Sequence, residues 1–341
     1  MSLAEQPLEN VSLEELNTLR ARVVARYYLS VHNTRELKSA LAWAGSNNVQ
    51  VLILGGGSNL VFRSDFDGLV IRMCVRIRCW EEVSKQEATL VLGAGENWHE
   101  SVLYAASTGY HGIENLALIP GTAGAAPVQN IGAYGVELCD TLVAVTVLDR
   151  HSFELVKLTR EECQFAYRDS LFKRTPGRFV IIEIRLRLSR SKPLQLGYRD
   201  LQEYFGNLAS DELKVTDVVE AVMAIRRRKL PDPVIIPNAG SFFKNPVITA
   251  VEFDALQARY PDIVSYRQTQ GVKLAAAWLI DQCGWKGFRN RHVGVHNQQA
   301  LVLINHSRGT GQDILELAGK IQESVNTRFG IQLEIEPGIV G

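Results

Sequence analysis

One stretch of the chain limits the possible folds more than any other: positions 119–135, which read IPGTAGAAPVQNIGAYG. The stretch holds four glycines and two prolines, and it has no lysine, arginine, aspartate or glutamate. This much glycine and proline disfavours both a helix and a strand, and the lack of charge is unusual for a loop in water. Two interpretations stay open: a buried structural loop, or small residues against which a flat ligand lies, with Gln129 and Asn130 bonding its edges. Long buried loops are uncommon and often functional, so we favour the ligand.

The composition indicates a globular protein of more than one domain. Its 341 residues exceed the usual domain length, and 46% of them are hydrophobic. Lysine and arginine number 37, as do aspartate and glutamate, so no excess of charge favours nucleic acid or an anionic membrane. The five cysteines are scattered without a CxxC pair, and no apolar run reaches membrane-spanning length. We therefore expect a cytoplasmic protein with reduced thiols, no metal site and no membrane or nucleic-acid partner.

The spacing of apolar residues predicts an α+β protein. Helices are expected at 34–44, with Thr34 as the N-cap and Gly45 as the stop, and at 98–107, 217–229, 272–284 and 313–330. Strands are expected at 49–54, 68–72, 88–92, 141–148, 179–188, 300–307 and 331–336. The sequence LPDP at 230–233 ends one helix and marks a domain boundary.

A glycine cluster, LGGGSNLVF at 54–62, follows the first expected strand. Adjacent glycines allow backbone N–H groups to approach a phosphate, and Ser58 and Asn59 add polar partners. The cluster is not a Rossmann fingerprint, because Leu60 interrupts GxGxxG, and no Gly-Lys-Ser/Thr follows to make a P-loop. By itself the pattern favours an ordinary tight turn over phosphate binding.

Three other segments carry side chains suited to catalysis or anion binding. In FAYRDSLFK (165–173), Arg168 lies among apolar residues and should be paired, either with Asp169 or with an anionic substrate. In NAGSFFKNP (238–246), a turn presents Ser241 as a nucleophile, a proton donor or merely a cap, and there is no GxSxG motif. The basic run at 226–229 covers every side of a helix end, so at least one of its residues should point inward toward an anion.

Together these segments resemble one family. The motifs LILGGGSNLVF, ENLALIPGTAGAAPVQNIGAYGVE, YRDSLFK, KLPDP, NAGSFFKNP, VKLAAAWLIDQCG and HNQQALVLIN occur in this order. Their order and spacing are similar to those of the UDP-N-acetylenolpyruvoylglucosamine reductases, over nearly the whole chain. The resemblance implies the FAD-binding fold of the vanillyl-alcohol-oxidase type with an additional α/β substrate-binding domain. The implied domains are 1–76, completed by a C-terminal strand at 333–341, then 77–225, and the substrate-binding domain at 226–332.

The resemblance also implies a non-covalent FAD, with NADPH as co-substrate, in a monomeric protein that acts on small molecules. The glycine cluster would hold the FAD pyrophosphate, and positions 119–135 would run beside the pyrophosphate and the isoalloxazine ring. The implied FAD-binding residues are Gly55, Gly56, Gly57, Ser58, Asn59, Pro120, Gly121, Thr122, Gly124, Ala125, Gln129, Asn130, Ile131, Gly132, Ala133, Tyr134 and Gly135.

The implied reaction reduces the enolpyruvyl ether of UDP-N-acetylglucosamine to UDP-N-acetylmuramate, a step of peptidoglycan precursor synthesis. Hydride would pass from FAD N5 to the vinyl carbon C3, Ser241 would protonate C2, and Arg168 would stabilise charge on the carboxylate. Glu336, in its protonated form, would donate a hydrogen bond to that carboxylate. Glu334 and Glu336 alternate on the last expected strand and should share a face; the distance from Leu333 and from the chain end favours Glu336.

The implied substrate-binding residues are Tyr167, Tyr198, Arg226, Lys229, Asn245 and Gln299. Tyr198 would fold over the substrate, as in the longer subclass of the family. Two other interpretations remain: a different FAD-dependent oxidoreductase of this fold, acting on a sugar or hydroxy acid, and a nucleotide-sugar-binding regulator without catalysis. The joint presence of Arg168, Ser241 and Glu336 argues against both.

Overall fold

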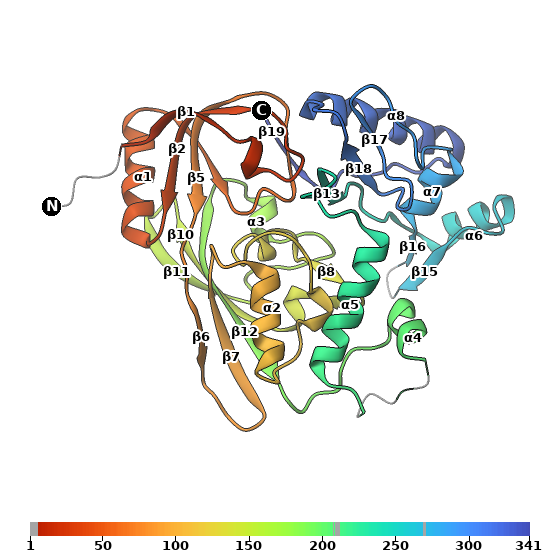
Figure 1. The fold of residues 1–341 in the computed structure, drawn as a ribbon, viewed down its shortest axis with the longest axis horizontal. Helices are drawn as coiled ribbons and strands as arrows, with labels where there is room; N and C mark the ends of the chain where they lie inside the picture. The colour runs from red at the N-terminus through yellow and green to blue at the C-terminus, as the bar shows by residue number, and fades with distance from the viewer. Residues whose placement is uncertain (1–5, 207, 209–211, 269–270) are drawn as a thin grey trace. The chain divides into compact units, whose positions relative to one another are not determined.

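A computed structural model describes residues 6–206, 208, 212–268 and 271–341. Contacts between Cα atoms divide the chain into two compact units, each assembled from separate segments (Figure 1). The first unit contains Met1–Val11, Ala25–Gly56 and Asp67–Arg228, and the second contains Ser12–Val24, Gly57–Phe66 and Lys229–Gly341. The three-part division expected from the sequence stays a prediction.

The first unit is built on two main sheets. One has the strand order β1-β2-β5-β3, in which β3 and β5 are parallel, and the other is antiparallel with the order β11-β10-β12-β7-β6. The short strands β8 and β9 pair with each other as a hairpin. The strands are β1 (Leu8–Ser12), β2 (Val24–Val31), β3 (Gln50–Leu54), β5 (Phe66–Met73), β6 (Arg78–Glu81), β7 (Glu87–Gly93), β8 (Gly132–Ala133), β9 (Val136–Glu137), β10 (Leu142–Asp149), β11 (Glu154–Thr159) and β12 (Phe179–Ser189). The helices are α1 (Thr34–Ser46), α2 (Trp98–Ser107), α3 (Leu171–Arg174), α4 (Arg199–Phe205) and α5 (Val215–Lys229), with 3-10 turns at Glu114–Leu116, Ala126–Gln129 and Leu138–Asp140.

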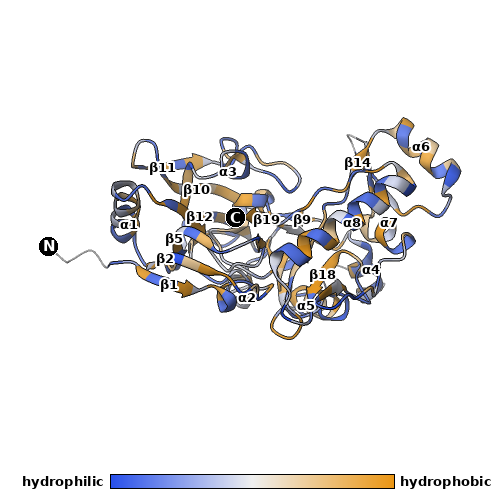
Figure 2. Cartoon of the chain, turned by 90° about the horizontal axis from the view of Figure 1, so that it is seen from above, coloured by the Kyte–Doolittle hydropathy of each residue, from blue (hydrophilic) through white to orange (hydrophobic). Residues whose placement is uncertain are grey.

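Strand β12 contributes to two hydrophobic cores. Ile181 and Ile184 pack in the core that α2 and α5 cover, whereas Val180 and Ile182 pack in the core beneath α1. A register shift against β10 at this point leaves one extra residue in β12, which changes the face that each following side chain takes. Figure 2 shows the apolar residues that run along β10 and β12.

The second unit has its core between α8 and two small sheets. The sheets have the orders β13-β18-β17 and β14-β16-β15, and β19 pairs in parallel with β4. Its elements are a 3-10 turn (Glu14–Leu16), β4 (Leu60–Phe62), β13 (Asn238–Ser241), β14 (Val247–Ile248), α6 (Ala250–Arg259), β15 (Ser265–Gln268), β16 (Gly271–Leu274), α7 (Ala276–Gln282), β17 (Val293–Val295), β18 (Val302–Asn305), α8 (Gly311–Phe329) and β19 (Gly338–Val340). Leu19 and Val61, from the two early segments, are fully buried in the same core as α8.

The mixed helix and strand content confirms the α+β class, with local corrections. Helix α1 is capped by Asn33 rather than Thr34, because the Asn33 side chain accepts from the Glu36 amide, and the helix continues past Gly45. The helix expected at 272–284 begins only at Ala276, because the preceding residues form strand β16. The last strand is Gly338–Val340 and not 331–336, where only Ile335 makes an isolated bridge, to Phe243.

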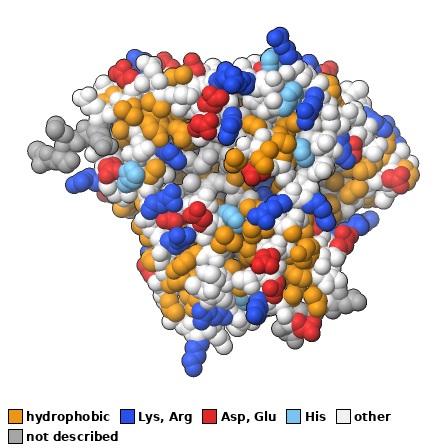
Figure 3. Space-filling model, viewed as in Figure 1, with side chains coloured by type: hydrophobic (Ala, Val, Ile, Leu, Met, Phe, Trp, Pro, Cys, Tyr) orange, Lys and Arg blue, Asp and Glu red, His pale blue; other side chains and the backbone are white. Residues whose placement is uncertain are grey.

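Charged side chains of both signs are mixed over the face shown in Figure 3. No helix within the described residues is long and apolar enough to cross a membrane.

Candidate active site

Two backbone segments of the first unit approach each other closely at glycines. A Cβ on Gly56 would lie 2.7 Å from the Gly121 Cα, and a Cβ on Gly55 would lie 2.6 Å from the Thr122 Oγ1. Ordinary side chains cannot fit at these distances, so glycine is required where the cluster after β3 meets the 119–135 stretch.

The turn at Gly121–Ala125 leaves polar groups for a ligand. The amides of Ala123 and Gly124 donate to the carbonyls of Glu96 and Ala94, at 2.8 and 3.0 Å. No described residue accepts from the amides of Gly121 and Thr122, and the buried Thr122 Oγ1 has no hydrogen-bond partner. Unpaired donors on a backbone that glycines keep open match the needs of a pyrophosphate, so these residues fit FAD.

The rest of the glycine cluster belongs to the second unit. Gly57 has a φ of +61°, and a Cβ there would lie 2.0 Å from the Leu16 carbonyl oxygen. The Gly57 carbonyl accepts from the Thr18 amide at 3.1 Å, and the Asn59 carbonyl accepts from the Gly338 amide at 3.0 Å. The backbone around Ser58 is therefore held by the 12–24 segment and by β19.

The second half of the 119–135 stretch forms the β8–β9 hairpin. Tyr134 and Gly135 both have positive φ, of +50° and +83°, as a two-residue hairpin turn requires. Before it, Asn130 is fully buried in the left-handed region. Its Nδ2 donates to Glu137 Oε2 at 2.9 Å, and its Oδ1 accepts from the Cys139 amide at 3.0 Å. Because this side chain bonds inside the protein and the Asn130 amide donates to the Pro127 carbonyl at 3.3 Å, the FAD contact that the resemblance implies for Asn130 stays a prediction.

Arg168 contacts this hairpin. Its Nη2 donates to the Gly132 carbonyl at 2.6 Å, and its Nη1 lies 4.0 Å from Glu137 Oε1. The guanidinium also lies over the Tyr167 ring, 5.2 Å from the ring centroid, which is within reach of a cation–π interaction. Asp169, which the sequence offered as a partner for Arg168, forms an ion pair with Arg174.

Arg226, the first residue of the basic run, is partly buried, whereas Arg227 and Arg228 are exposed. Its Nη2 donates to the Leu118 carbonyl at 3.3 Å, and its Nε is buried without a hydrogen-bond partner. Burial lowers the pKa of Arg226, and Tyr134 partly opposes this effect. A buried cation with an unused donor suits an anionic ligand, as the sequence indicated.

Tyr198, at the start of α4, contacts the hairpin turn. Its ring meets that of Tyr134 edge to face, with centroids 5.2 Å apart. Burial raises the pKa of Tyr134, so its hydroxyl stays neutral near pH 7. The residue expected to cover the substrate thus rests on the stretch expected to contact FAD.

In the second unit, backbone pairing brings Ser241 and Glu336 together. The Glu336 amide donates to the Phe242 carbonyl at 2.9 Å, beside Ser241 at the end of β13. Asn238 shapes this turn, since its Oδ1 accepts from the Gly240 amide at 2.8 Å. Glu334 instead forms an ion pair with Lys244 and is 68% exposed, which supports Glu336 as the site residue.

The other predicted substrate-binding residues also lie in the second unit. The Asn245 Oδ1 accepts from the Ala276 amide at 2.9 Å, at the first turn of α7. The Gln299 Oε1 accepts from the Leu301 amide at 3.3 Å, at the start of β18. Lys229 is the last residue of α5 and is half-buried.

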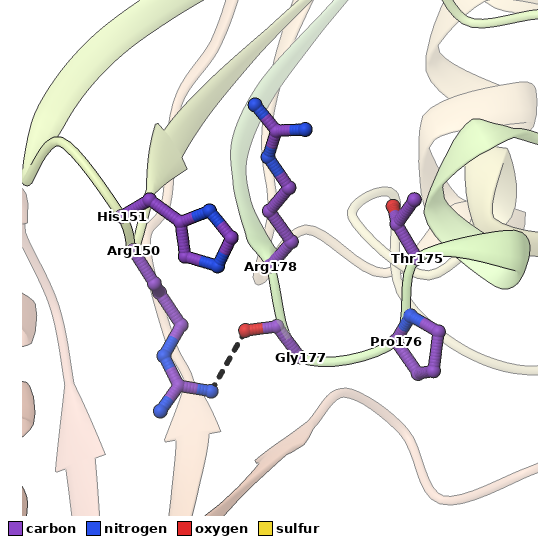
Figure 4. Close-up of a pocket in the computed structure, with 6 residues that line it drawn as sticks. All are labelled: Arg150, His151, Thr175, Pro176, Gly177 and Arg178. Atoms are coloured by element: carbon purple, nitrogen blue, oxygen red, sulfur yellow. Dashed lines mark hydrogen bonds between the residues drawn. The ribbon is translucent and has the colours of Figure 1, made fainter.

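A cavity of about 660 Å³ lies elsewhere, in the first unit, and none of the predicted site residues lines it. Figure 4 shows Arg150, His151 and Arg178 around it. Arg150 donates to the Gly177 carbonyl at 2.9 Å, and Arg178 pairs with Asp149 at 3.1 Å. Because Arg150 and Arg178 already have protein partners, we do not infer a ligand-binding site at this cavity.

Sequence reasoning missed Glu137. Glu137 directly follows the NIGAYGV sequence. It pairs with Gly132 because Tyr134 and Gly135 form a two-residue turn, and in the sequence this turn is indicated only by a Tyr-Gly dipeptide. Nothing in the sequence connected that register to Arg168.

Proteins of known name match the chain over its full length. A UDP-N-acetylenolpyruvoylglucosamine reductase from Pseudomonas fluorescens is 45% identical over 339 residues, which covers 99% of each chain. A protein of that name from Chromobacterium violaceum is 46% identical, covering 97% of this chain and 98% of the other. The crystal structure of the reductase from Thermus caldophilus superposes with a TM-score of 0.70 at 25% identity, covering 99% of this chain and all of that one.

The family matches divide along the chain. Residues 25–158 match the FAD binding domain family, and residues 232–340 match the family described as UDP-N-acetylenolpyruvoylglucosamine reductase, C-terminal domain. The fold and the glycine-lined site therefore define an FAD-dependent oxidoreductase, as the sequence predicted. With relatives at 45% identity over the whole length, the chain belongs to the UDP-N-acetylenolpyruvoylglucosamine reductases, also called UDP-N-acetylmuramate dehydrogenases.

Proposed function

We propose that this protein reduces the enolpyruvyl ether of UDP-N-acetylglucosamine to UDP-N-acetylmuramate with NADPH, in cytoplasmic peptidoglycan precursor synthesis. One observation carries the proposal beyond the family name. The 119–135 stretch has open amides and an unpaired hydroxyl at Gly121 and Thr122, and its Gly132 carbonyl holds Arg168. One segment thus combines a phosphate-type cradle with a fixed cation.

FAD, when bound, would supply the hydride chemistry that connects NADPH with the vinyl carbon C3 of the substrate. Gly55, Gly56, Gly121 and Thr122 would hold its pyrophosphate through backbone amides. The small residues Gly132, Ala133 and Gly135 would allow the flat ring to lie near the backbone. The lack of charge between 119 and 135 keeps fixed ions away from that ring.

Arg168 would bind the substrate carboxylate. Addition of hydride at C3 places negative charge on C2 and the carboxylate, and a guanidinium that is already oriented stabilises such charge without reorganising. The Arg168 side chain is only 18% exposed, so water screens its charge less than at the surface.

Ser241 would deliver the proton to C2, and Glu336 would donate a hydrogen bond to the carboxylate. A serine hydroxyl is a weak acid, but a carbanion-like centre is a strong base, so the transfer is downhill. Arg226, with its unused Nε donor, would contact an anionic group of the sugar nucleotide. Tyr198 would cover the bound substrate from its position on Tyr134.

Two half-reactions, followed separately without oxygen, test the proposal. The purified protein should be yellow and release flavin on denaturation, NADPH should bleach it, and the enolpyruvyl sugar nucleotide should restore the colour. A hydroxy acid or free sugar that restored the colour while the sugar nucleotide did not would favour the other oxidoreductase of this fold. Failure to take up FAD would contradict the proposal entirely.

Substitution of Ser241 by alanine tests the proton donor. The variant should keep the rate of bleaching by NADPH and slow the return of colour by roughly 10²–10⁴-fold, because only the second step needs the proton. An equal loss in both half-reactions would show that Ser241 has another role.

A further inference from the structure

Two short turns of the first unit hold Glu137 and Arg168 against each other. In the β8–β9 hairpin, Glu137 lies directly opposite Gly132. Arg168 lies in a turn that two hydrogen bonds between Ala166 and Asp169 close, at 3.0 and 3.1 Å, and it has a φ of +54°. A non-glycine residue in this left-handed region is strained, and such strain often marks a functional position.

Both oxygens of the Glu137 carboxylate have partners, and the Cys139 thiol also donates to Oε2, at 3.8 Å. Oε2 accepts from Asn130 Nδ2 at 2.9 Å, while Oε1 faces Arg168 Nη1 at 4.0 Å. The same Asn130 amide lies 3.3 Å from the Ala166 carbonyl, so Asn130 joins the hairpin to the turn that carries Arg168. The position of the carboxylate is therefore fixed by a fully buried side chain.

Gly132 leaves space for this arrangement. A Cβ there would lie 2.9 Å from Arg168 Nη1 and 3.0 Å from the Glu137 Cγ. The guanidinium thus has a short hydrogen bond to a backbone carbonyl on one nitrogen and a more distant anion on the other. At 4.0 Å the Glu137 carboxylate attracts the guanidinium electrostatically and so restricts the orientations that the Arg168 side chain can take.

We propose that Glu137 is a positioning residue, which aims the Arg168 guanidinium at the substrate carboxylate. The inference rests on the proposed function, because it assigns the purpose of Arg168 in that reaction. A free arginine side chain has many rotamers, and fixing it in advance removes that entropic cost from the transition state. Glu137 and the Gly132 carbonyl together provide this fixation.

The test uses the FAD-loaded protein and the substitution Glu137→Gln, which keeps the shape of the side chain and removes its charge. Bleaching by NADPH should stay within about twofold of the unsubstituted protein, and reoxidation by the enolpyruvyl substrate should slow at least about tenfold, since small misplacement of a fixed group is costly. Glu82→Gln, which removes an exposed carboxylate paired with Arg187 in the same unit, should change neither rate.

A double-mutant cycle with Arg168→Gln separates positioning from a general structural role. If Glu137 acts through Arg168, Glu137→Gln should add less than about twofold to the slow rate of Arg168→Gln. Calorimetric titration of the oxidised protein gives an independent readout: Glu137→Gln should change the affinity for the enolpyruvyl substrate but not for UDP-N-acetylglucosamine, which lacks the carboxylate.

The experiments distinguish failure of the proposed function from failure of the inference about Glu137. If the unsubstituted protein does not return to the oxidised colour with the enolpyruvyl substrate, the proposed function is wrong and the inference falls with it. If that protein reacts and Glu137→Gln matches it, slows both half-reactions equally, or adds its full effect to Arg168→Gln, the inference alone is overturned.

Discussion

Gly56 and Gly121 lie where a methyl group in place of one hydrogen would push apart the two segments proposed to hold FAD. We expect Gly56→Ala to lower the affinity for FAD by at least about tenfold, because its Cβ would lie 2.7 Å from the Gly121 Cα and force the two segments apart. Absorbance titration of the flavin-free protein with FAD measures the effect.

The matched control is Gly45→Ala in α1 of the same unit. A Cβ at Gly45 meets no atom within 4 Å, and the residue is helical, so the substitution should raise stability by about 0.5–1 kcal/mol and leave FAD binding unchanged. Normal FAD affinity in Gly56→Ala would show that the close approach is not part of the cofactor site.

Glu137 gives a prediction about pH. Burial raises the pKa of Glu137 above its ordinary value, and the nearby charge of Asp140 adds to the rise. The charge of Arg168 and the hydrogen bonds from Asn130 and the Cys139 thiol oppose it. A carboxyl group whose folded pKa is raised contributes stability below its unfolded pKa and loses it as pH rises through the folded value. Charged Glu137 therefore costs stability at neutral pH.

The expected outcome is that Glu137→Gln melts no lower than the unsubstituted protein at pH 7. Any gain in melting temperature that the variant shows should shrink as the pH falls toward the ordinary pKa of glutamate, because Glu137 is then protonated in both the folded and the unfolded protein. Thermal denaturation from pH 4 to 8 measures this trend, and a large loss of stability at pH 7 would point to a structural role for the carboxylate.

At the scale of elements, the stability of helix α8 (Gly311–Phe329) depends on the hydrogen bonds that cap its first turn. The Thr310 side chain accepts from the Asp313 amide at 3.1 Å, and the Asp313 carboxylate accepts from the Thr310 amide at 2.7 Å. Thr310→Ala should lower the free energy of unfolding by about 0.5–2 kcal/mol, the usual cost of losing an N-cap. Urea denaturation measures the change.

Gly319, in the middle of α8, provides the control for that prediction. A Cβ there meets no atom within 4 Å, so Gly319→Ala should stabilise the same helix by about 0.5–1 kcal/mol. If neither variant shifts the unfolding midpoint, α8 does not unfold with the rest of the molecule.

Elements that local pattern controls were predictable from the sequence. Helix α2 spans Trp98–Ser107 as expected, because Asn97 caps it and its apolar residues share a face. The segment 272–284 was misassigned because VKLAAAWLI is apolar apart from Lys273, so its pattern does not separate a strand from a helix. Pairing with β14 and β15 makes its first part a strand. The residues around Glu336 read as a strand, yet their main partner is the 242–244 segment, which no local pattern reveals.

The site could be predicted from the sequence only in part. The missing charge at 119–135 and the glycines after β3 indicated a ligand, but family resemblance was needed to name FAD. At least one residue of the basic run was predicted to point inward, because four consecutive residues cover every side of a helix end, and Arg226, which donates to the Leu118 carbonyl, does so. Glu137 could not be found, because its role depends on a register and on a contact with a residue 31 positions away, as 168 minus 137 gives.

At the scale of the whole molecule, FAD should raise thermal stability. A ligand that binds only the folded state adds about 1.4 kcal/mol for each tenfold rise in its concentration above the dissociation constant. The melting temperature should therefore increase steadily with the logarithm of FAD concentration, and Gly56→Ala should require more FAD for the same rise. A melting temperature independent of FAD would contradict the assigned cofactor site.

The parallel pair β4–β19 has a consequence for biosynthesis. Leu60 pairs with Gly338, so the ribosome adds 278 residues, as 338 minus 60 gives, before the partner of β4 exists. At about 5–20 residues per second, that delay is roughly 15–55 s. Throughout that delay β4 lacks its partner strand, although its residue Val61 ends fully buried in the same core as α8. The nascent chain therefore carries an apolar strand with an unpaired edge, and the β4–β19 pair can form only after translation is nearly complete.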